Sequence, residues 1–542
     1  MFLSALRSLL SLKSHRPIRQ SANTALRVEN LEDRWVPSTL TVGSGHQYSS
    51  ISAAVAAASP GSTIDVYPGT YTETVAIPAR DSGLSLLAEG AVTIQSPAPI
   101  SSGAKDIING YNIGAALIDD QGATFVKITG FTVNGSTNTD HTLFAGIRVI
   151  DNGSATITGN TVENIGPASD PTFGMGIEIG TFRGNGSPGL ANIQNNTISN
   201  YSIDGVIVDG NGSAAEIVSN TITGSSSTLV QYGVQISRNA SARVQLNHIS
   251  NNTALITSNP TAGAGVYVYA DSTHTLSAVD VIAQNWINNN ETGILFDESL
   301  ATSDTRSSDI DFYNNDITNS GDNGGITVFG SLSFSTSLDI ENNLISGGQA
   351  GSYVVGLFNV SNSLILNNCI SGSTQYDGIY MTASSGNQVS WNSISGNGGN
   401  GIESDSGNCN QFYFNCMTGN VMNGILLDSG TGNNIWLSDS YSNGIDGIQL
   451  VSTMSTTVVG DLLLANGQYG LAMYGAKNTL VAFDLIADNG AGAIYSDANT
   501  SGTTYIDNWV AGSVTLSAQG AENTSIQVTN SYCNADNLCA GL

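Results

Sequence analysis

Basic side chains are scarce in this chain. Its 542 residues include 15 Lys and Arg residues against 43 Asp and Glu residues, a formal net charge of −28 at pH 7. After Arg306 the only basic residue is Lys477, and no His follows His274. Clustered Lys and Arg bind phosphate backbones, so we expect no nucleic-acid partner. Because His, Lys and Arg also supply much acid-base chemistry, we expect the C-terminal half to be structural.

Cysteine and long apolar stretches are also few. No run approaches the ~20 apolar residues of a transmembrane helix, so no transmembrane segment is predicted. The 5 Cys residues form no zinc-binding pattern. Cys533 and Cys539 are near enough in sequence to close a small loop, but the sequence leaves open whether they form a disulfide.

Helix-forming patterns are missing from residues 101–512. This region is rich in Ile, Val, Thr, Ser, Asn and Gly, which are more typical of strands and turns than of helices. Apolar and polar residues alternate, the period of a strand with one buried face. We therefore predict an all-β protein.

Two markers recur together along the chain. One is a Gly before an apolar-x-apolar triplet, and the last seven of these lie 22 or 23 residues apart. These glycines are Gly146, Gly176, Gly205, Gly233, Gly265, Gly293, Gly325, Gly356, Gly378, Gly401, Gly424, Gly447, Gly470 and Gly492. The other marker is a polar residue two before an apolar one: Asn160, Asn196, Asn220, Asn247, Asn285, Asn315, Asn343, Asn368, Asn392, Asn415, Asp439, Asp461, Asp484 and Asn508. Such periodicity indicates one unit stacked many times.

Each unit is predicted to form three short strands that close one turn of a right-handed, single-stranded parallel β-helix. About 15–16 turns, each rising ~4.8 Å, would make a coil of roughly 75 Å. A leucine-rich repeat has a similar period, but here the core residues are Ile and Val and Leu is not fixed. The Asn residues are predicted to occupy left-handed bends and to stack as an amide ladder. Asp439, Asp461 and Asp484 would repel one another there unless backbone donors, a cation or raised pKa values compensate.

The repeat and the segment from Ser49 to Glu73, SSISAAVAAASPGSTIDVYPGTYTE, resemble the right-handed β-helix family of pectin-lyase-like proteins. That resemblance implies a short helix capping the N-terminal end of the coil. We expect the cap and first turns over residues 41–100 and the β-helix over 101–512. Within it, 101–355 is loop-rich and 356–512 regular, and a C-terminal turn and cap follow over 513–542.

Residues 1–40 have a different composition. Leu31, Glu32, Arg34, Pro37 and Ser38 resemble an LEDRxxPS segment found near the N-terminus of exported proteins of planctomycete-like bacteria. The resemblance implies an export segment, disordered in the mature chain, and an extracellular or cell-surface location. A plain solvated tail is the alternative.

Family enzymes bind substrate along the strands that follow the Gly. Because the loops between residues 140 and 330 are the longest, we expect a site there. Alternate residues of these strands point outward, so Tyr267, Tyr269, Phe358 and Tyr380 are predicted to form an outward aromatic set. These rings would stack on sugars, or they are simply exposed strand formers.

A second set of candidates is charged. Polysaccharide lyases of this family use calcium and an Arg or Lys base, which would make Glu178, Asp204 and Asp209 metal ligands and Arg238 and Arg148 catalytic. Arg148 and Glu178 are equally explained as a surface ion pair. The QD and DxIFG motifs of pectin methylesterases and the YGxDPH signature of mannuronan epimerases are missing.

The sequence therefore leaves three functions open. The first is an exported or cell-surface β-helix that binds, and in one version also processes, a polysaccharide or cell-surface glycan along the loop-walled groove of its N-terminal half. The second is a calcium-assisted polysaccharide lyase or glycoside hydrolase, and the third is a purely structural surface protein. The strong negative charge disfavours a polyuronate partner unless a cation bridges it.

Overall fold

The computed structural model describes residues 37–97, 107–108, 111–112, 114–136, 143–166, 174–181, 187–225, 230–253, 263–270, 281–302, 310–321, 324–348, 352–516 and 521–528. The segment 1–36, most of the export-like region, and the proposed Cys533–Cys539 pair lie outside these residues. The domain boundaries given above stay predictions.

The one α-helix among the described residues, α1 (Ile51–Ala57), lies where the sequence predicts it. The Ser50 side chain caps it by accepting a hydrogen bond from Ala53 N–H at 3.3 Å. The Glu73 carboxylate accepts from the N–H groups of Ile51 and Ser52 at 2.8 and 2.9 Å, the favourable place for a negative charge. The helix contacts β1 (Thr39–Val42), β2 (Thr63–Val66) and β4 (Val75–Pro78). Its role as a cap stays a prediction.

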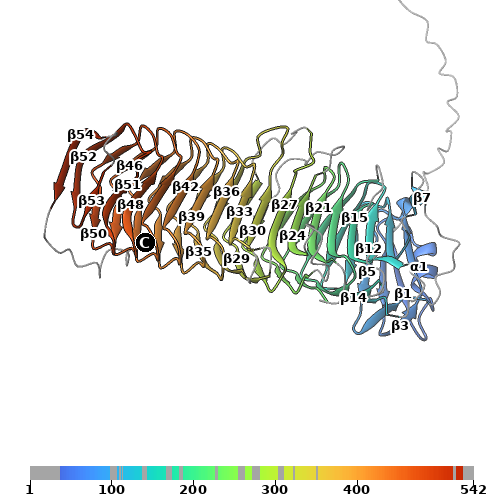
Figure 1. The fold of residues 1–542 in the computed structure, drawn as a ribbon. Helices are drawn as coiled ribbons and strands as arrows, with labels where there is room; N and C mark the ends of the chain where they lie inside the picture. Colours follow the sequence, from blue (N-terminus) through green and yellow to red (C-terminus); the bar gives the residue numbers. More distant parts are fainter. Residues whose placement is uncertain are drawn as a thin grey trace, which may run out of the picture. The chain divides into compact units, whose positions relative to one another are not determined.

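The rest of the fold is a parallel coil with three faces (Figure 1). We call the face built from the strands after the repeated Gly the glycine sheet. In pairing order it contains β4, β9 (Ala115–Gln121), β12 (Leu143–Ile150), β15 (Met175–Gly180), β18 (Asp204–Asp209), β21 (Tyr232–Ser237), β24 (Ala264–Tyr269), β27 (Thr292–Asp297), β30 (Ile326–Phe329), β33 (Val355–Phe358), β36 (Ile379–Thr382), β39 (Ile402–Asp405), β42 (Ile425–Asp428), β45 (Ile448–Val451), β48 (Tyr469–Tyr474), β51 (Gly492–Ser496) and β53 (Val514–Thr515).

The other two faces are parallel ladders as well. The second sheet runs from β1 and β2 through β10 (Val126–Thr129), β13 (Gly153–Thr158), β16 (Gly189–Gln194), β19 (Ala214–Val218) and β22 (Ser241–Gln245) to β54 (Ala521–Val528). The third runs from β3 (Gly69–Thr72) to β50 (Leu485–Ala487). From β4 to β50 the coil makes about 15 turns of three strands each, whereas the turns at either end have two strands. A short antiparallel pair, β7 (Ile107–Ile108) and β8 (Tyr111–Asn112), stands outside the ladders.

Ile, Val and Leu side chains fill the interior of the coil and are almost fully buried. The repeated glycines are required by close approach between turns. A Cβ atom on Gly205 would lie 2.4 Å from Cγ2 of Ile222 and 2.6 Å from the carbonyl oxygen of Gly233. The predicted column is wrong at two turns, where Val354 and Ala493 take the position assigned to Gly356 and Gly492.

The predicted Asn column forms a continuous ladder. Asn392 donates its side-chain amide to Asn415 Oδ1 at 3.0 Å, and its own Oδ1 accepts from Asn368 N–H at 2.9 Å. The prediction is wrong for Asp439, because Ser438 holds that position and accepts from Asn415 N–H at 3.3 Å. The left-handed residue is also not the column Asn but the one before it, such as Asn367 (φ 54°) or Trp391 (φ 58°).

Two further amide columns follow the other corners. One contains Asn387, Asn410 and Asn433, and the other contains Asn397, Asn420, Asn443, Asn466 and Asn489. Within one turn the three columns are five residues apart, as in Asn387, Asn392 and Asn397. Each corner is therefore fixed by side-chain hydrogen bonds to the next turn.

Candidate functional site

On the outward face of the glycine sheet, one column of side chains is buried throughout the N-terminal half. The second residue after the marker position of each strand forms one outward-pointing column. From β12 to β30 every member of this column is buried, with these exposed fractions: Arg148 0%, Glu178 1%, Ile207 0%, Gln235 7%, Tyr267 6%, Leu295 4% and Thr327 8%. Tyr267 packs with Ile203, Tyr232, Ala264 and Leu295. The expected open groove over residues 140–330 is therefore not found on this column, and Tyr267 is not an exposed sugar platform.

Arg148 is a buried ion-pair partner. Its Nε donates to Asp119 Oδ1 at 2.8 Å and its Nη2 to Asp119 Oδ2 at 2.7 Å, and Nη1 donates to the Gly114 carbonyl oxygen at 3.2 Å. A fully buried guanidinium held by a carboxylate has no access to a polymer. This arrangement argues against the catalytic role expected for Arg148.

Arg238 is also committed to a carboxylate. It is in the left-handed region (φ 53°), and its guanidinium contacts both oxygens of Asp209, with Nε at 2.8 Å from Oδ1. Ser237 Oγ donates to the same Oδ1 at 2.7 Å. The cation beside Asp209 is thus a side chain of the protein, which disfavours both a calcium ion bound to Asp209 and a free Arg238 base.

The other expected metal ligands, Glu178 and Asp204, are buried as well. Both carboxyl oxygens of Asp204 lack a hydrogen-bond partner, and burial raises its pKa well above the ordinary value, with further contributions from Asp209 and Glu178. A neutral acid is a poor calcium ligand. Within the described ranges, no group of three or more His, Cys, Asp or Glu side chains is arranged to hold a metal ion.

The exposed part of the glycine sheet lies farther along the chain, from β33 onward. Because Val354 replaces the marker glycine, Gly356 rather than Phe358 pairs with Tyr380 across the turn. A Cβ atom on Gly356 would lie 3.1 Å from the ring of Phe358 and 3.7 Å from that of Tyr353. Because Gly356 has no side chain, the rings of Phe358 and Tyr353 can occupy the space beside it.

We name Tyr353, Phe358, Tyr376 and Tyr380 the aromatic cluster. Tyr353 and Tyr380 stack with ring centroids 4.1 Å apart and an interplanar angle of 7°, and Tyr376 meets Tyr353 edge-on at 5.4 Å. Phe358 lies 5.8 Å from Tyr380 and stacks on Phe329 at 4.9 Å. All four rings of the cluster keep some solvent exposure, so they offer apolar surface at the face of the sheet. Two of the predicted residues, Phe358 and Tyr380, are thus brought together here, whereas Tyr269 lies farther N-terminal, against the buried Tyr267.

Two carboxyl groups adjoin this cluster. Glu403 follows Tyr380 in the same column, and its side chain is hydrogen-bonded to that of Asp377. Burial, followed by the charge of Asp377, raises the pKa of Glu403 to about 7, and burial also raises the pKa of Asp377. The Asn400 side chain donates to Glu403 Oε2 at 2.8 Å. The pair therefore retains a proton to higher pH than ordinary carboxyls do, and it presents polar groups beside the rings.

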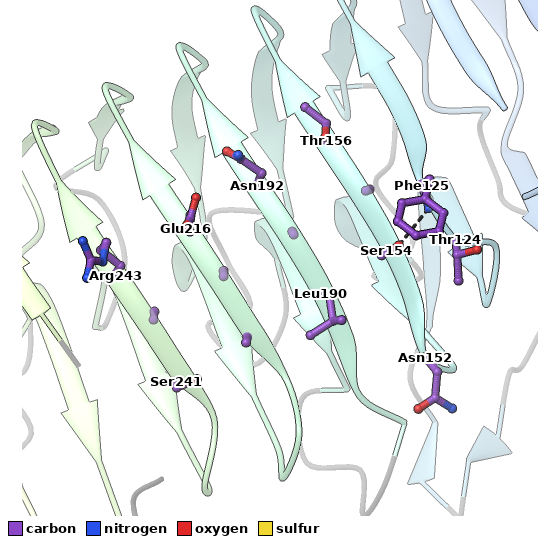
Figure 2. Close-up of a pocket in the computed structure, with 15 residues that line it drawn as sticks. Thr124, Phe125, Asn152, Ser154, Thr156, Leu190, Asn192, Glu216, Ser241 and Arg243 are labelled. Atoms are coloured by element: carbon purple, nitrogen blue, oxygen red, sulfur yellow. Dashed lines mark hydrogen bonds between the residues drawn. The ribbon is translucent and has the colours of Figure 1, made fainter. Parts of the chain in front are cut away.

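A separate open groove lies on the second sheet (Figure 2). Its volume is about 620 Å³, and its lining comes from β13, β16, β19 and β22 and from residues just before β10 and β13. Figure 2 shows Glu216 and Arg243 on neighbouring strands and Phe125 beside Ser154, whose Oγ accepts from Phe125 N–H at 2.8 Å. Alanine side chains make up much of the lining, and Phe125 is 79% exposed. The groove lacks the stacked rings and the paired carboxyls found on the glycine sheet, so we regard the latter as the candidate site.

A family model described as a right handed beta helix region matches residues 114–304 and 301–440, more than half of the chain. The chain belongs to the right-handed β-helix family. None of the helices in the described part of this β-helix protein is long and apolar enough to span a membrane.

Several solved structures resemble this β-helix protein in fold. The Dettilon tailspike protein is 15% identical, with a TM-score of 0.40 over 61% of this chain and 60% of the tailspike chain. Gene product 12 of bacteriophage phi29, in its pre-mature form, is 12% identical, with a TM-score of 0.46 over 85% and 70% of the two chains. The pectin methylesterase of Aspergillus niger is 16% identical, with a TM-score of 0.35 over 51% and 84%. No curated protein sequence matches this chain.

Sequence reasoning missed Tyr353, Tyr376 and Asp377. Each lies before a marker position, in a stretch that resembles an ordinary turn. The signal that could have found them is a column of polar and aromatic residues immediately before the marker position. In successive turns this column contains Tyr353, Asp377, Asn400, Asn423, Asp446 and Tyr469.

Proposed function

We propose that this protein binds an uncharged polysaccharide on the glycine sheet, at the aromatic cluster and the Asp377–Glu403 pair. The observation that carries the proposal is the combination of partly exposed stacked rings with the hydrogen-bonded carboxyl pair Asp377 and Glu403 beside them. The C–H faces of a sugar pack against aromatic rings, and its hydroxyls need donors and acceptors close by.

The charge around the cluster supports an uncharged ligand. Glu403 and Asp377 are followed on the same face by Asp405, Asp428 and Asp446, whereas Lys477 is the only basic residue after Arg306. A polyanion would be repelled from this face unless cations bridged it. Together with the export-like N-terminal segment, this favours a surface protein that holds a neutral glycan.

A glycan array tests the proposal. The full chain is applied, with and without calcium, to oligosaccharides of glucan, xylan, mannan and galactan, and to alginate and polygalacturonate. We expect calcium-independent binding to at least one uncharged polymer, strongly weakened in Tyr380→Ala and also weakened in Gly356→Ala, which crowds Tyr353 and Phe358. Tyr413→Ala, on the second sheet, is the matched control. Binding only to the charged polymers with calcium would favour the lyase alternative, and no binding at all would favour a structural role.

A second candidate function is hydrolysis of the bound chain. The observation in its favour is that the Asp377–Glu403 carboxyl pair lies beside the ring of Tyr380, where burial and the charge of Asp377 raise the pKa of Glu403 to about 7, a value that suits proton exchange at neutral pH. Release of reducing ends from the bound polymer would support hydrolysis, and Glu403→Gln should abolish release while retaining binding. Binding without any release would leave the protein as a binding module.

A further inference from the structure

The arrangement of the aromatic cluster is repeated farther along the glycine sheet. We name Tyr469, Tyr474 and Tyr495 the second aromatic cluster. Tyr469 precedes its marker Gly470 as Tyr353 precedes Val354, and Tyr474 ends β48 as Phe358 ends β33. Tyr469 and Tyr495 stack with centroids 5.1 Å apart, and Tyr474 lies 5.4 Å from Tyr495. The three rings therefore occupy the same three columns as Tyr353, Phe358 and Tyr380.

Both clusters are built around a small residue. Gly356 pairs with Tyr380 on the next turn, and Ala472 pairs with Tyr495 in the same way. In each case the tyrosine of the following turn lies beside a position without a large side chain. Ala472 is fully buried, whereas the three tyrosines around it remain partly exposed.

The turns between the clusters are joined by a row of buried polar side chains, Asn400, Asn423 and Asp446. In the column before the marker glycine, Asn423 N–H donates to Asn400 Oδ1 at 3.0 Å and Asp446 N–H donates to Asn423 Oδ1 at 2.9 Å. Asp446 Oδ1 then accepts from Tyr469 N–H at 2.8 Å, and its Oδ2 accepts from the Gln449 side chain at 3.1 Å. One continuous hydrogen-bonded row thus connects the carboxyl pair to the second cluster.

The distance between the clusters follows from the strand spacing. From β33 to β48 there are five steps of the coil, which at ~4.8 Å each amount to about 24 Å. The clusters are in register along this length, because every intervening strand pairs with its neighbours without a shift.

We infer that the two clusters bind the same polymer chain at once. The ligand is a linear, uncharged polysaccharide that lies parallel to the coil axis, with each end of a segment of about 24 Å on one cluster and its hydroxyls over the partly exposed side chains of Glu403 and Gln449. This inference rests on the proposed function and adds to it the direction and minimum length of the ligand. Joining two weak sites through one ligand makes the second contact intramolecular, which raises the affinity without new contacts.

Isothermal titration with ligands of graded length tests the inference. The probes are the disaccharide, tetrasaccharide and octasaccharide of glucan, xylan, mannan and galactan. We expect short probes of the polymer that binds to occupy two weak sites per protein, and the octasaccharide to occupy one site with an affinity at least about tenfold higher. Tyr495→Ala should abolish this gain and leave one weak site for short probes.

The controls separate this inference from the proposed function. Tyr380→Ala should likewise abolish the gain but leave the site at Tyr495, and Tyr413→Ala should change nothing. Equal affinity and stoichiometry for short and long probes, or an unchanged octasaccharide affinity in folded Tyr495→Ala, would overturn the inference while the proposed function stands. Lack of binding by every probe would overturn both.

Discussion

Asp461 and Asp484 are neighbours in a column whose other members are mostly amides. Asp461 N–H donates to Asp484 Oδ1 at 2.8 Å, but Oδ2 of each carboxyl is buried without a hydrogen-bond partner. One turn farther, Asn508 uses the equivalent Nδ2 to donate to the Val481 carbonyl oxygen at 2.8 Å. Burial raises the pKa of Asp461 to about 8 and that of Asp484 well above its ordinary value. Of the three ways in which repulsion between these acids could be relieved, raised pKa values are one that the structure shows. The column contains two acids rather than three, because Ser438 takes the place expected for Asp439.

Asp461→Asn should therefore stabilise the protein. The amide replaces an unsatisfied oxygen by a donor, which we expect to raise the free energy of unfolding by about 1–3 kcal/mol at pH 8. The folded-state pKa of the acid is raised, so its stability contribution is present below pH ~4 and is lost as the pH rises through about 8. The gain measured by urea unfolding should thus be larger at pH 9 than at pH 5. A less stable variant at pH 9 would contradict this account.

The carboxyl pair of the candidate site should show a similar dependence on pH. Because the pKa of Glu403 is raised to about 7, wild-type protein should lose stability as the pH rises from about 4.5 through 7. Glu403→Gln cannot ionise, so its melting temperature should change less over this range. Asp405→Asn, on the next column of the same strand, serves as the control. Parallel curves for wild type and Glu403→Gln would show that the pair does not retain a proton to higher pH.

The amide ladder should be a main source of stability. Asn392→Ala removes the acceptor of Asn368 N–H and the donors to Ile365 O and to Asn415 Oδ1, all of them buried. We expect a loss of roughly 2–4 kcal/mol in denaturant unfolding, because buried groups are left unpaired. Asn434→Ala, on a partly exposed strand position, should cost little. Similar losses for the two variants would indicate that the ladder has no special role.

Some corner residues should be suboptimal for stability. Phe483 has a left-handed backbone (φ 60°) and is 60% exposed, whereas the equivalent position is Asn367 or Gly460 in other turns. Since bulky side chains are strained in this region, Phe483→Asn should stabilise the chain by about 1 kcal/mol. Thermal unfolding of the variant tests this expectation. A clear loss of stability would mean that packing of the Phe483 ring outweighs the backbone strain.

The coil was predictable because its markers report backbone geometry directly. Glycine is favoured where turns approach closely, and asparagine is favoured where a corner needs both an acceptor and a donor. The prediction failed where another residue had the same sequence pattern as the marker. Gly356 is followed by the expected apolar residue, yet Val354, two residues earlier, occupies the marker position in the structure. Asp439 was misplaced for the same reason, because the adjacent Ser438 can also accept a hydrogen bond.

The candidate site was less predictable because burial depends on distant partners. Nothing near Arg148 in sequence shows that Asp119, 29 residues earlier, holds its guanidinium. The column containing Tyr267 was correctly expected to point outward from the strand, but its burial depends on packing against Tyr232 and Leu295. The rings of Tyr353, Phe358 and Tyr380 come from three different columns on two neighbouring turns, and Gly356 lies two residues beyond the true marker position, which no single-strand pattern reveals.

A crystal of the protein soaked with an uncharged octasaccharide from the polymer that binds in the array tests the central claim most directly. The account predicts a sugar chain on the glycine sheet, in contact with Tyr353 and Tyr380 and hydrogen-bonded to Glu403. A chain seated instead in the second-sheet groove beside Phe125 and Arg243 would contradict it.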